Sequence, residues 1–159
     1  MALEKQRVLA PTTREDGIPP NQIEYKTRRL VNDYLQPPKV TRKYELAQTR
    51  LAEVREDLET RMMVRNSHEL MRALEAHSIL DCADMAAFAS LYRTESRWGL
   101  YHLRSDYPEK NDADWFCHTL LSKKNGQMAC EQRAVDPYVV PIAEEERGLY
   151  DKQRIRASA

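Results

Sequence analysis

Glycine is scarce in this chain, and none of its glycines stands in a phosphate-binding motif. The 159 residues contain only four glycines, at positions 17, 99, 126 and 148. Neither GxGxxG nor GxxxxGK[ST] occurs, although such motifs are what bring backbone N–H groups close to phosphates. No serine has the glycine-flanked setting of a nucleophile elbow. The sequence therefore predicts no nucleotide cradle and no elbow-type nucleophile in this chain.

Long apolar runs and an excess of one charge are missing as well. No apolar run approaches the roughly 20 residues that span a bilayer, and the segment MALEKQRVLAPTTRED lacks the apolar core of a signal peptide. Lys and Arg total 25, which equals the 25 Asp and Glu, so no bulk attraction to nucleic acid or anionic lipid arises. We expect a cytoplasmic protein with no nucleic-acid partner and no direct membrane insertion.

Cysteine and histidine are few and badly spaced for metal binding. The three cysteines, Cys82, Cys117 and Cys130, form no CxxC pair, and no HxxxH pair occurs, whereas zinc sites use such close ligand pairs. Reduced thiols are the plain interpretation, with a disulfide between Cys117 and Cys130 as the alternative. Cys82 lies in an apolar stretch and is predicted to be a small core residue.

The apolar spacing predicts a mainly α fold: an antiparallel three-helix bundle followed by a short β-hairpin and an extended C-terminal arm. Residues 1–20 are expected to form an irregular arm. Helices are predicted from residue 21 to the Pro37-Pro38 pair, over 41–64, and from an N-cap at Asn66 to about residue 92. Strands are predicted at 116–121 and 128–135, joined by the favoured turn pair Asn125-Gly126.

The second and third predicted helices differ in the distribution of their apolar residues. In the second helix these residues recur every three or four positions and form one stripe, at Tyr44, Ala47, Leu51, Val54, Leu58 and Met62. The third is apolar on more than one side, so we expect it to be the most buried of the three. The chain is accordingly divided into an N-terminal arm at 1–20, a helical domain at 21–140 and a tail at 141–159.

The segment from Arg93 to Trp115, RTESRWGLYHLRSDYPEKNDADW, is too polar for a core and too aromatic for an ordinary solvated loop. It holds both tryptophans and alternates acids with arginines, which suits an ion-pair network. Arginine and aromatic residues are also enriched in buried interfaces. Three interpretations stay open from the residues alone: a self-contained loop that caps the helices, a docking surface, or a catalytic loop.

The same residues resemble a known family motif. Arg93, Glu95-Ser96-Arg97, His102, Arg104, Asp106-Tyr107-Pro108, Asp112 and Trp115 are similar to the R-x-ESRG-x-H-x-R-x-DYP-x-x-DD-x-x-W signature. That signature belongs to the C-terminal helical domain of fumarate reductase and succinate dehydrogenase flavoproteins. The helix beginning at His68 also resembles the adenylylsulfate reductase alpha subunit. The resemblance covers roughly residues 20–140 and implies a spectrin-repeat-like three-helix bundle.

Two departures from the family pattern qualify this resemblance. The stretch from Ser96 to His102 is two residues longer than the family motif, which points away from standard succinate dehydrogenase and towards the adenylylsulfate reductase-like branch or an uncharacterised one. The FAD-binding and substrate-capping domains of the family have no counterpart in these 159 residues. No catalytic, cofactor-binding or metal-binding residue is therefore carried over to this chain.

The resemblance implies a structural and docking domain of an FAD-dependent oxidoreductase involved in electron transfer. FAD would belong to the parent enzyme, and iron–sulfur clusters in a partner subunit are an open alternative. The predicted partners are the FAD-binding domain or subunit and an iron–sulfur subunit, with localisation in the cytoplasm or peripherally at the inner face of the membrane. We also expect the isolated chain to self-associate.

A network of eight residues is predicted to set the loop and its docking: Arg93, Glu95, Arg97, His102, Arg104, Asp106, Tyr107 and Trp115. The alternative function is a free-standing helical-bundle interaction protein or assembly factor that docks on a flavoprotein in trans.

Overall fold

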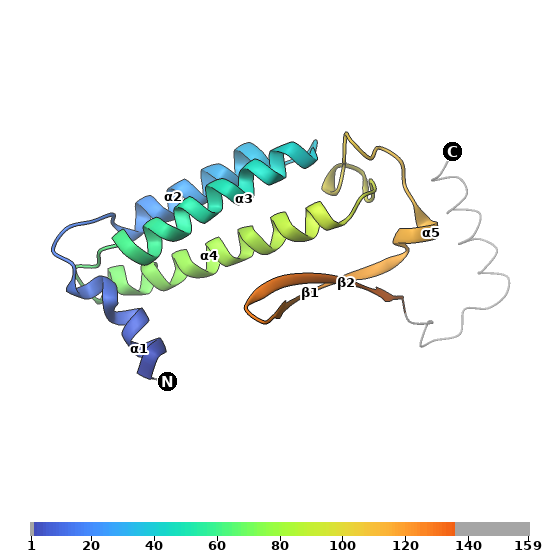
Figure 1. The fold of residues 1–159 in the computed structure, drawn as a ribbon. Coiled ribbons are helices and arrows are strands. Elements are labelled where there is room, and N and C mark those ends of the chain that lie inside the picture. Colours follow the sequence, from blue (N-terminus) through green and yellow to red (C-terminus); the bar gives the residue numbers. More distant parts are fainter. Residues whose placement is uncertain (1, 136–159) are drawn as a thin grey trace, which may run out of the picture.

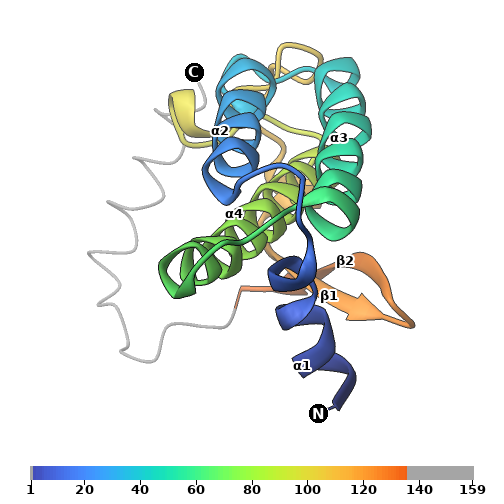
Figure 2. The ribbon, with the colours of Figure 1, turned by 90° about the vertical axis from the view of Figure 1, so that its left-hand side faces the viewer.

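Three long helices make up most of the structure, a computed structural model that describes residues 2–135. They are α2 (Pro20–Leu30), α3 (Thr41–Glu56) and α4 (Ser67–Tyr92). Each of the first two ends in one wider π-helical turn, at Val31–Leu35 and Asp57–Arg61. Successive helices run in opposite directions (Figure 1), and α4 lies beneath the pair formed by α2 and α3 (Figure 2).

Shorter elements complete the described chain. They are α1 (Ala2–Leu9), 3-10 turns at Ala10–Thr13 and Gly99–Tyr101, α5 (Asp112–Trp115), β1 (Cys117–Lys124) and β2 (Gln127–Ala134). A mostly helical fold with one antiparallel hairpin is therefore confirmed. The predicted arm and tail beyond Asp136 lie outside the described residues. No helix within residues 2–135 is long and apolar enough to cross a membrane.

The predicted apolar stripe of α3 forms the centre of the core. All six of its members are buried, including Met62 just beyond the π turn. The face of α4 that meets them carries mainly alanines, at Ala73, Ala76, Ala83 and Ala87, with Leu80 among them. Small side chains let helices approach closely, because interhelical distance depends on the side chains at the contact. The core is thus built from large residues on α3 and small ones on α4.

Only one side of α4, the helix predicted to be the most buried, is enclosed by the rest of the described structure. Met71, Leu74 and Met85 are 50%, 44% and 42% exposed, and Cys82 is exposed rather than part of the core. The reason is geometric: α2 and α3 cover one side of α4 and the hairpin meets it from another direction (Figure 1). Within the described residues nothing covers the outer side of α4, so its apolar residues there face solvent.

The N-terminal arm is more ordered than predicted. Its first half is helical, and Ile18 is buried in the connection between α3 and α4. The Ile18 N–H donates to the Arg61 carbonyl at 2.8 Å, and the Met63 N–H donates to the Ile18 carbonyl at 3.0 Å. The arm therefore forms a short parallel bridge with the residues that follow α3. Helical periodicity cannot predict this contact, because it joins residues far apart in the sequence.

The predicted helix start and hairpin turn are both confirmed. The Asn66 side chain accepts a hydrogen bond from the Glu69 N–H at 2.9 Å, which caps α4. Asn125 and Gly126 have φ values of 52° and 83°, as a tight two-residue hairpin turn requires. The cap and the turn are local features, so a few neighbouring residues suffice to predict them.

The hairpin register excludes the disulfide alternative. Cys117 pairs with Ala134, whereas Cys130 pairs with Leu121. The two cysteines are thus separated by four positions along the strands, or roughly 13 Å, and a disulfide requires Cα atoms within about 7 Å. All three cysteines are free.

Gly17 provides a test of the N-terminal bridge. A Cβ atom at Gly17 would lie 2.1 Å from the Arg61 carbonyl oxygen, and the φ of 152° is unfavourable for other residues. We expect Gly17→Ala to lower the free energy of unfolding by at least about 2 kcal/mol, because the backbone of the bridge must shift. Urea unfolding followed by circular dichroism measures this. Gly126→Ala, where a Cβ meets open space, should cost only about 1 kcal/mol; equal losses would contradict the bridge.

Candidate functional site

Arg104 is the centre of the loop and is completely buried. Its guanidinium forms a two-pronged ion pair with Asp106, with Nε–Oδ1 and Nη2–Oδ2 distances of 2.8 Å each. Nη1 donates to the Ser90 carbonyl at 2.6 Å, at the end of α4, and to the Arg93 carbonyl at 3.2 Å. Charge-assisted bonds of this kind are the strong ones, so Arg104 ties the loop to the C-terminal end of α4.

The partner of Arg104 also caps a second helix. Asp106 accepts hydrogen bonds from the N–H of Thr41, at 2.8 Å, and from its hydroxyl. Val40, the residue before α3, supplies no side-chain cap, so a carboxylate 65 positions away satisfies the start of that helix. The Arg104 guanidinium lowers the pKa of Asp106 far below its usual range. The loop is thereby attached to α3 as well as to α4.

A second ion-pair cluster surrounds Glu95, which is also fully buried. Arg97 Nε and Nη2 donate to its two oxygens at 2.6 and 2.9 Å, and the Asn111 N–H adds a bond at 2.9 Å. Arg97 also reaches Asp112 at 2.8 Å. Hydrogen bonding to Lys110, followed by Arg97, lowers the pKa of Asp112 to about 2. Both oxygens of the buried Glu95 carboxylate therefore have hydrogen-bonding partners within the loop.

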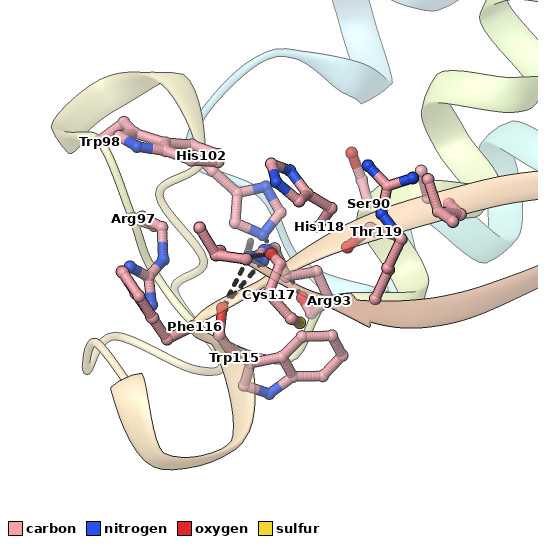
Figure 3. Close-up of a pocket in the computed structure, with 14 residues that line it drawn as sticks. Ser90, Arg93, Arg97, Trp98, His102, Trp115, Phe116, Cys117, His118 and Thr119 are labelled. Carbon is pink, nitrogen blue, oxygen red and sulfur yellow. Dashed lines mark hydrogen bonds between the residues drawn. The ribbon is translucent and has the colours of Figure 1, made fainter. Parts of the chain in front are cut away.

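Arg93 lies between the two tryptophans. Its guanidinium carbon is 5.6 Å from the Trp98 ring centre and 5.4 Å from that of Trp115, within the range of cation–π attraction. It donates to the Trp115 carbonyl at 2.9 Å and to the Cys117 carbonyl at 3.2 Å (Figure 3). Arg93 therefore connects the end of α4 to the start of the hairpin.

His102 is buried beside these cations. Lys39 Nζ is 3.3 Å from its Nδ1, and the Arg93 carbonyl is 3.4 Å from its Nε2, so the ring is neutral with its proton on Nε2. Burial first, then the charge of Lys39, lowers the pKa of His102 to about 4. This histidine is therefore uncharged at neutral pH and acts as a hydrogen-bonding part of the loop.

The structure brings all eight predicted network residues into one region of the loop, and it pairs the charged ones with each other or with backbone. Tyr107 lies over Arg104, with its ring centre 5.0 Å from the guanidinium carbon, and is 41% exposed. The predicted role of these residues in docking stays a prediction. Their observed contacts are all within this chain.

Sequence reasoning missed the outward-facing residues of the same loop. Trp98, Leu100 and Tyr101 are 67%, 72% and 85% exposed, and Trp98 and Gly99 both have a φ of 58°. We call residues 98–101 the aromatic tip. The Arg97 N–H donates to the His102 carbonyl at 3.0 Å across its base. The available signal was the two extra residues in this stretch compared with the family motif.

An open pocket of about 550 Å³ lies beside the aromatic tip, between the end of α4 and the hairpin (Figure 3). Trp98, Trp115 and Phe116 supply its aromatic walls, and His118 and Arg133 are at its hairpin side. No group of three or more His, Cys, Asp or Glu side chains suited to a metal ion occurs in residues 2–135. The arrangement can thus receive an apolar or anionic group.

Comparison with known proteins identifies the family. A family profile described as "Fumarate reductase flavoprotein C-term" matches residues 26–149. The chain belongs to this family. Succinate dehydrogenase flavoprotein subunits of Rickettsia felis and Rickettsia conorii are each 44% identical to it over 54 residues, which is 34% of this chain and 9% of theirs. The resemblance found in the loop motif is therefore confirmed.

Solved structures share the fold of this family member. Adenylylsulfate reductase from Archaeoglobus fulgidus matches 89% of this chain with a TM-score of 0.80 at 24% identity, over 25% of its own length. Mycobacterium smegmatis Sdh1 in complex with UQ1 matches 98% with a TM-score of 0.78 at 23% identity, over 27% of its length. The chain thus spans about a quarter of the solved chains and under a tenth of the curated relatives.

Replacing Arg104 tests whether the loop and the helices form one unit. We expect Arg104→Ala to lower the free energy of unfolding by about 3–5 kcal/mol, because it removes the partner of Asp106 and the bonds to α3 and α4. Both tryptophans lie in the loop, so their fluorescence reports the loop while circular dichroism reports the helices. Both urea transitions should shift together, and Arg42→Ala, at an exposed site on α3, should change stability by under about 0.5 kcal/mol. A loop transition that moves alone would contradict this coupling.

His102 predicts a dependence of stability on pH. Because its pKa falls from about 6.5 unfolded to about 4 folded, the unfolded chain binds the extra proton between these values. Stability is therefore complete above pH 6.5 and declines as pH falls towards 4, by up to about 3 kcal/mol. Urea midpoints measured from pH 7.5 to 4 should show the decline, and His102→Asn should flatten it. His68→Asn, at an exposed site at the start of α4, is the control outside the loop; an unchanged slope in His102→Asn would refute the assignment.

Proposed function

We propose that this chain is the structural and docking part of an FAD-dependent flavoprotein of the fumarate reductase, succinate dehydrogenase and adenylylsulfate reductase type. It carries no catalytic group of its own and packs against the flavin-binding part of the enzyme. The observation that carries this proposal is the division of the loop into inward charges and outward aromatics. The buried charges of the described loop are paired internally, whereas the aromatic tip is exposed.

The helical domain is proposed to extend from residue 21 to 140, preceded by the arm and followed by the tail. The family match over 26–149 overlaps most of the proposed domain and extends into the tail. We interpret α2, α3 and α4 as a spectrin-repeat-like three-helix bundle, which the alternation of helix directions supports. The bundle would serve as a rigid support that holds the loop and hairpin toward the partner.

FAD would be bound by the remainder of the flavoprotein. The described residues do not fit it: they contain no βαβ unit, and their glycines at 17, 99 and 126 lie in three separate turns. A dinucleotide instead needs a glycine-rich turn between a strand and a helix. The whole enzyme would transfer two electrons between a small substrate and FAD. An iron–sulfur subunit would then be a second partner, placing the assembly in the cytoplasm or peripherally at the inner face of the membrane.

The first experiment is to purify this polypeptide from its native host and record its intact mass and visible absorption spectrum. A yellow species much larger than 18.6 kDa would support a flavoprotein tail. A flavin-containing complex in which the chain itself has a mass of 18.6 kDa would support docking in trans. A colourless 18.6 kDa species that binds no flavoprotein would reject both forms of the proposal.

Exposure of the aromatic tip predicts that the isolated 159-residue chain self-associates. Sedimentation equilibrium should show a mass that rises with concentration. Trp98→Ser combined with Tyr101→Ser should shift the chain towards monomer by removing apolar contacts. Tyr25→Ser alters an exposed aromatic on α2 and should leave the association unchanged. A monomer at all concentrations, or equal effects of the two variants, would count against docking through the tip.

A further inference from the structure

The hairpin beside the aromatic tip carries a cationic side chain, Arg133, with no acidic partner in the described chain. His118 and Arg133 face each other in the strand register, and both are exposed. No salt bridge joins either of them to an acid among residues 2–135. The loop arginines behave differently, since Arg97 and Arg104 each have a carboxylate partner.

His118 and Arg133 line the pocket whose walls are formed by the aromatic side chains. His118 on the hairpin and the rings of Trp98, Trp115 and Phe116 line the pocket (Figure 3). Arg133, on the other strand of the hairpin, belongs to the same lining. Phe116 is 47% exposed and Trp98 is 67% exposed, so the apolar surface continues from the pocket onto the tip. An occupant therefore needs a carboxylate for Arg133 and apolar side chains for the rings.

We propose that the pocket receives an acidic, apolar peptide segment of the flavin-binding part of the flavoprotein. A carboxylate of that segment pairs with Arg133, and neighbouring apolar residues cover the aromatic tip. This inference rests on the proposed function and adds which face docks and which chemistry it recognises.

Size and rigidity favour a protein segment as the occupant. Similar solved chains are about four times as long as the stretch that this chain matches, since the match covers 25% and 27% of them. Most of such a flavoprotein therefore lies outside the domain and must be joined to it. The tip is held at its base by the Arg97–His102 bond, and a rigid aromatic anchor loses little conformational entropy when it is covered. Pocket and tip together offer one continuous surface for such a segment.

Site-specific photo-crosslinking tests the proposal in the native host. A benzoylphenylalanine replaces Tyr101 at the tip in a tagged copy of the full chain, and in a second copy it replaces Tyr25, an exposed control on α2. The purified material is irradiated, its flavin absorbance is recorded, and the crosslinked peptides are mapped by mass spectrometry. We expect the probe at 101 to mark a segment of the flavin-binding part that contains Asp or Glu, and the probe at 25 not to mark it.

Charge reversal then tests the recognition chemistry. Arg133→Glu should lower the crosslink yield from position 101 by about tenfold, because it replaces attraction with repulsion. Arg42→Glu, at an exposed arginine on α3, should leave the yield unchanged. Changing the marked carboxylate to Lys in the Arg133→Glu background should restore the yield. Circular dichroism confirms that each variant is folded.

The outcomes separate the two proposals. Flavin that co-purifies while position 101 marks only a second copy, or only residues 136–159 of the same chain, overturns this inference and leaves the proposed function standing. An unaltered yield in Arg133→Glu also overturns it. If no flavin co-purifies with the chain, both the proposed function and this inference fail.

Discussion

Burial of the Arg104 guanidinium is the constraint on which the loop depends. A buried charge is costly unless it is paired and its hydrogen-bonding groups are satisfied. Here the compensation comes from Asp106, from carbonyls near the end of α4 and from the Thr41 hydroxyl at the start of α3. The loop can therefore be closed only when both helices are in place. One side chain thereby couples a segment without regular structure to the helical core.

The same constraint explains why the loop is both polar and ordered. Glu95 is fully buried, and its charge is balanced by Arg97, while the Asn111 N–H supplies a further bond. Ser96 adds a neutral link, since its hydroxyl donates to the Tyr107 carbonyl and accepts from the Arg104 N–H, each at 2.8 Å. Such networks specify one arrangement because every member left unpaired would carry a desolvation cost. The conformation of this loop is therefore set mainly by hydrogen bonds and ion pairs, whereas the helices are held by apolar packing.

What the sequence could predict depends on the range of the interaction involved. The cap at Asn66, the Asn125-Gly126 turn and the apolar stripe of α3 are encoded within a few residues or one helical period, and all three are confirmed. Apolar content alone did not predict the exposed side of α4, because a helix can be apolar on a side that residues 2–135 leave uncovered.

For the candidate site, too, local patterns could be predicted and long-range contacts could not. The motif residues could be gathered from sequence because acids and arginines alternate within one short segment. Their partners could not: the contact between Asp106 and Thr41 joins residues 65 positions apart. The bridge at Ile18 is another long-range contact, and no local pattern predicts either. The segment was predicted to expose an aromatic surface, but Trp98, Leu100 and Tyr101 were not singled out as the residues that form it.

The aromatic tip is exposed to solvent and is also held in one backbone conformation. Trp98 holds a left-handed backbone conformation, with a φ of 58°, and strain of this kind persists only where the surroundings impose it. The Arg97–His102 bond and the stacking of Trp98 on Arg93 supply that restraint. The internal ion pairs hold the base of the loop, and the base in turn holds the tryptophan outward. An aromatic side chain fixed in this position keeps apolar surface in contact with water while it is uncovered. It loses little conformational entropy when another surface covers it. The buried ion pairs therefore fix the position in which the rings of the tip stay exposed.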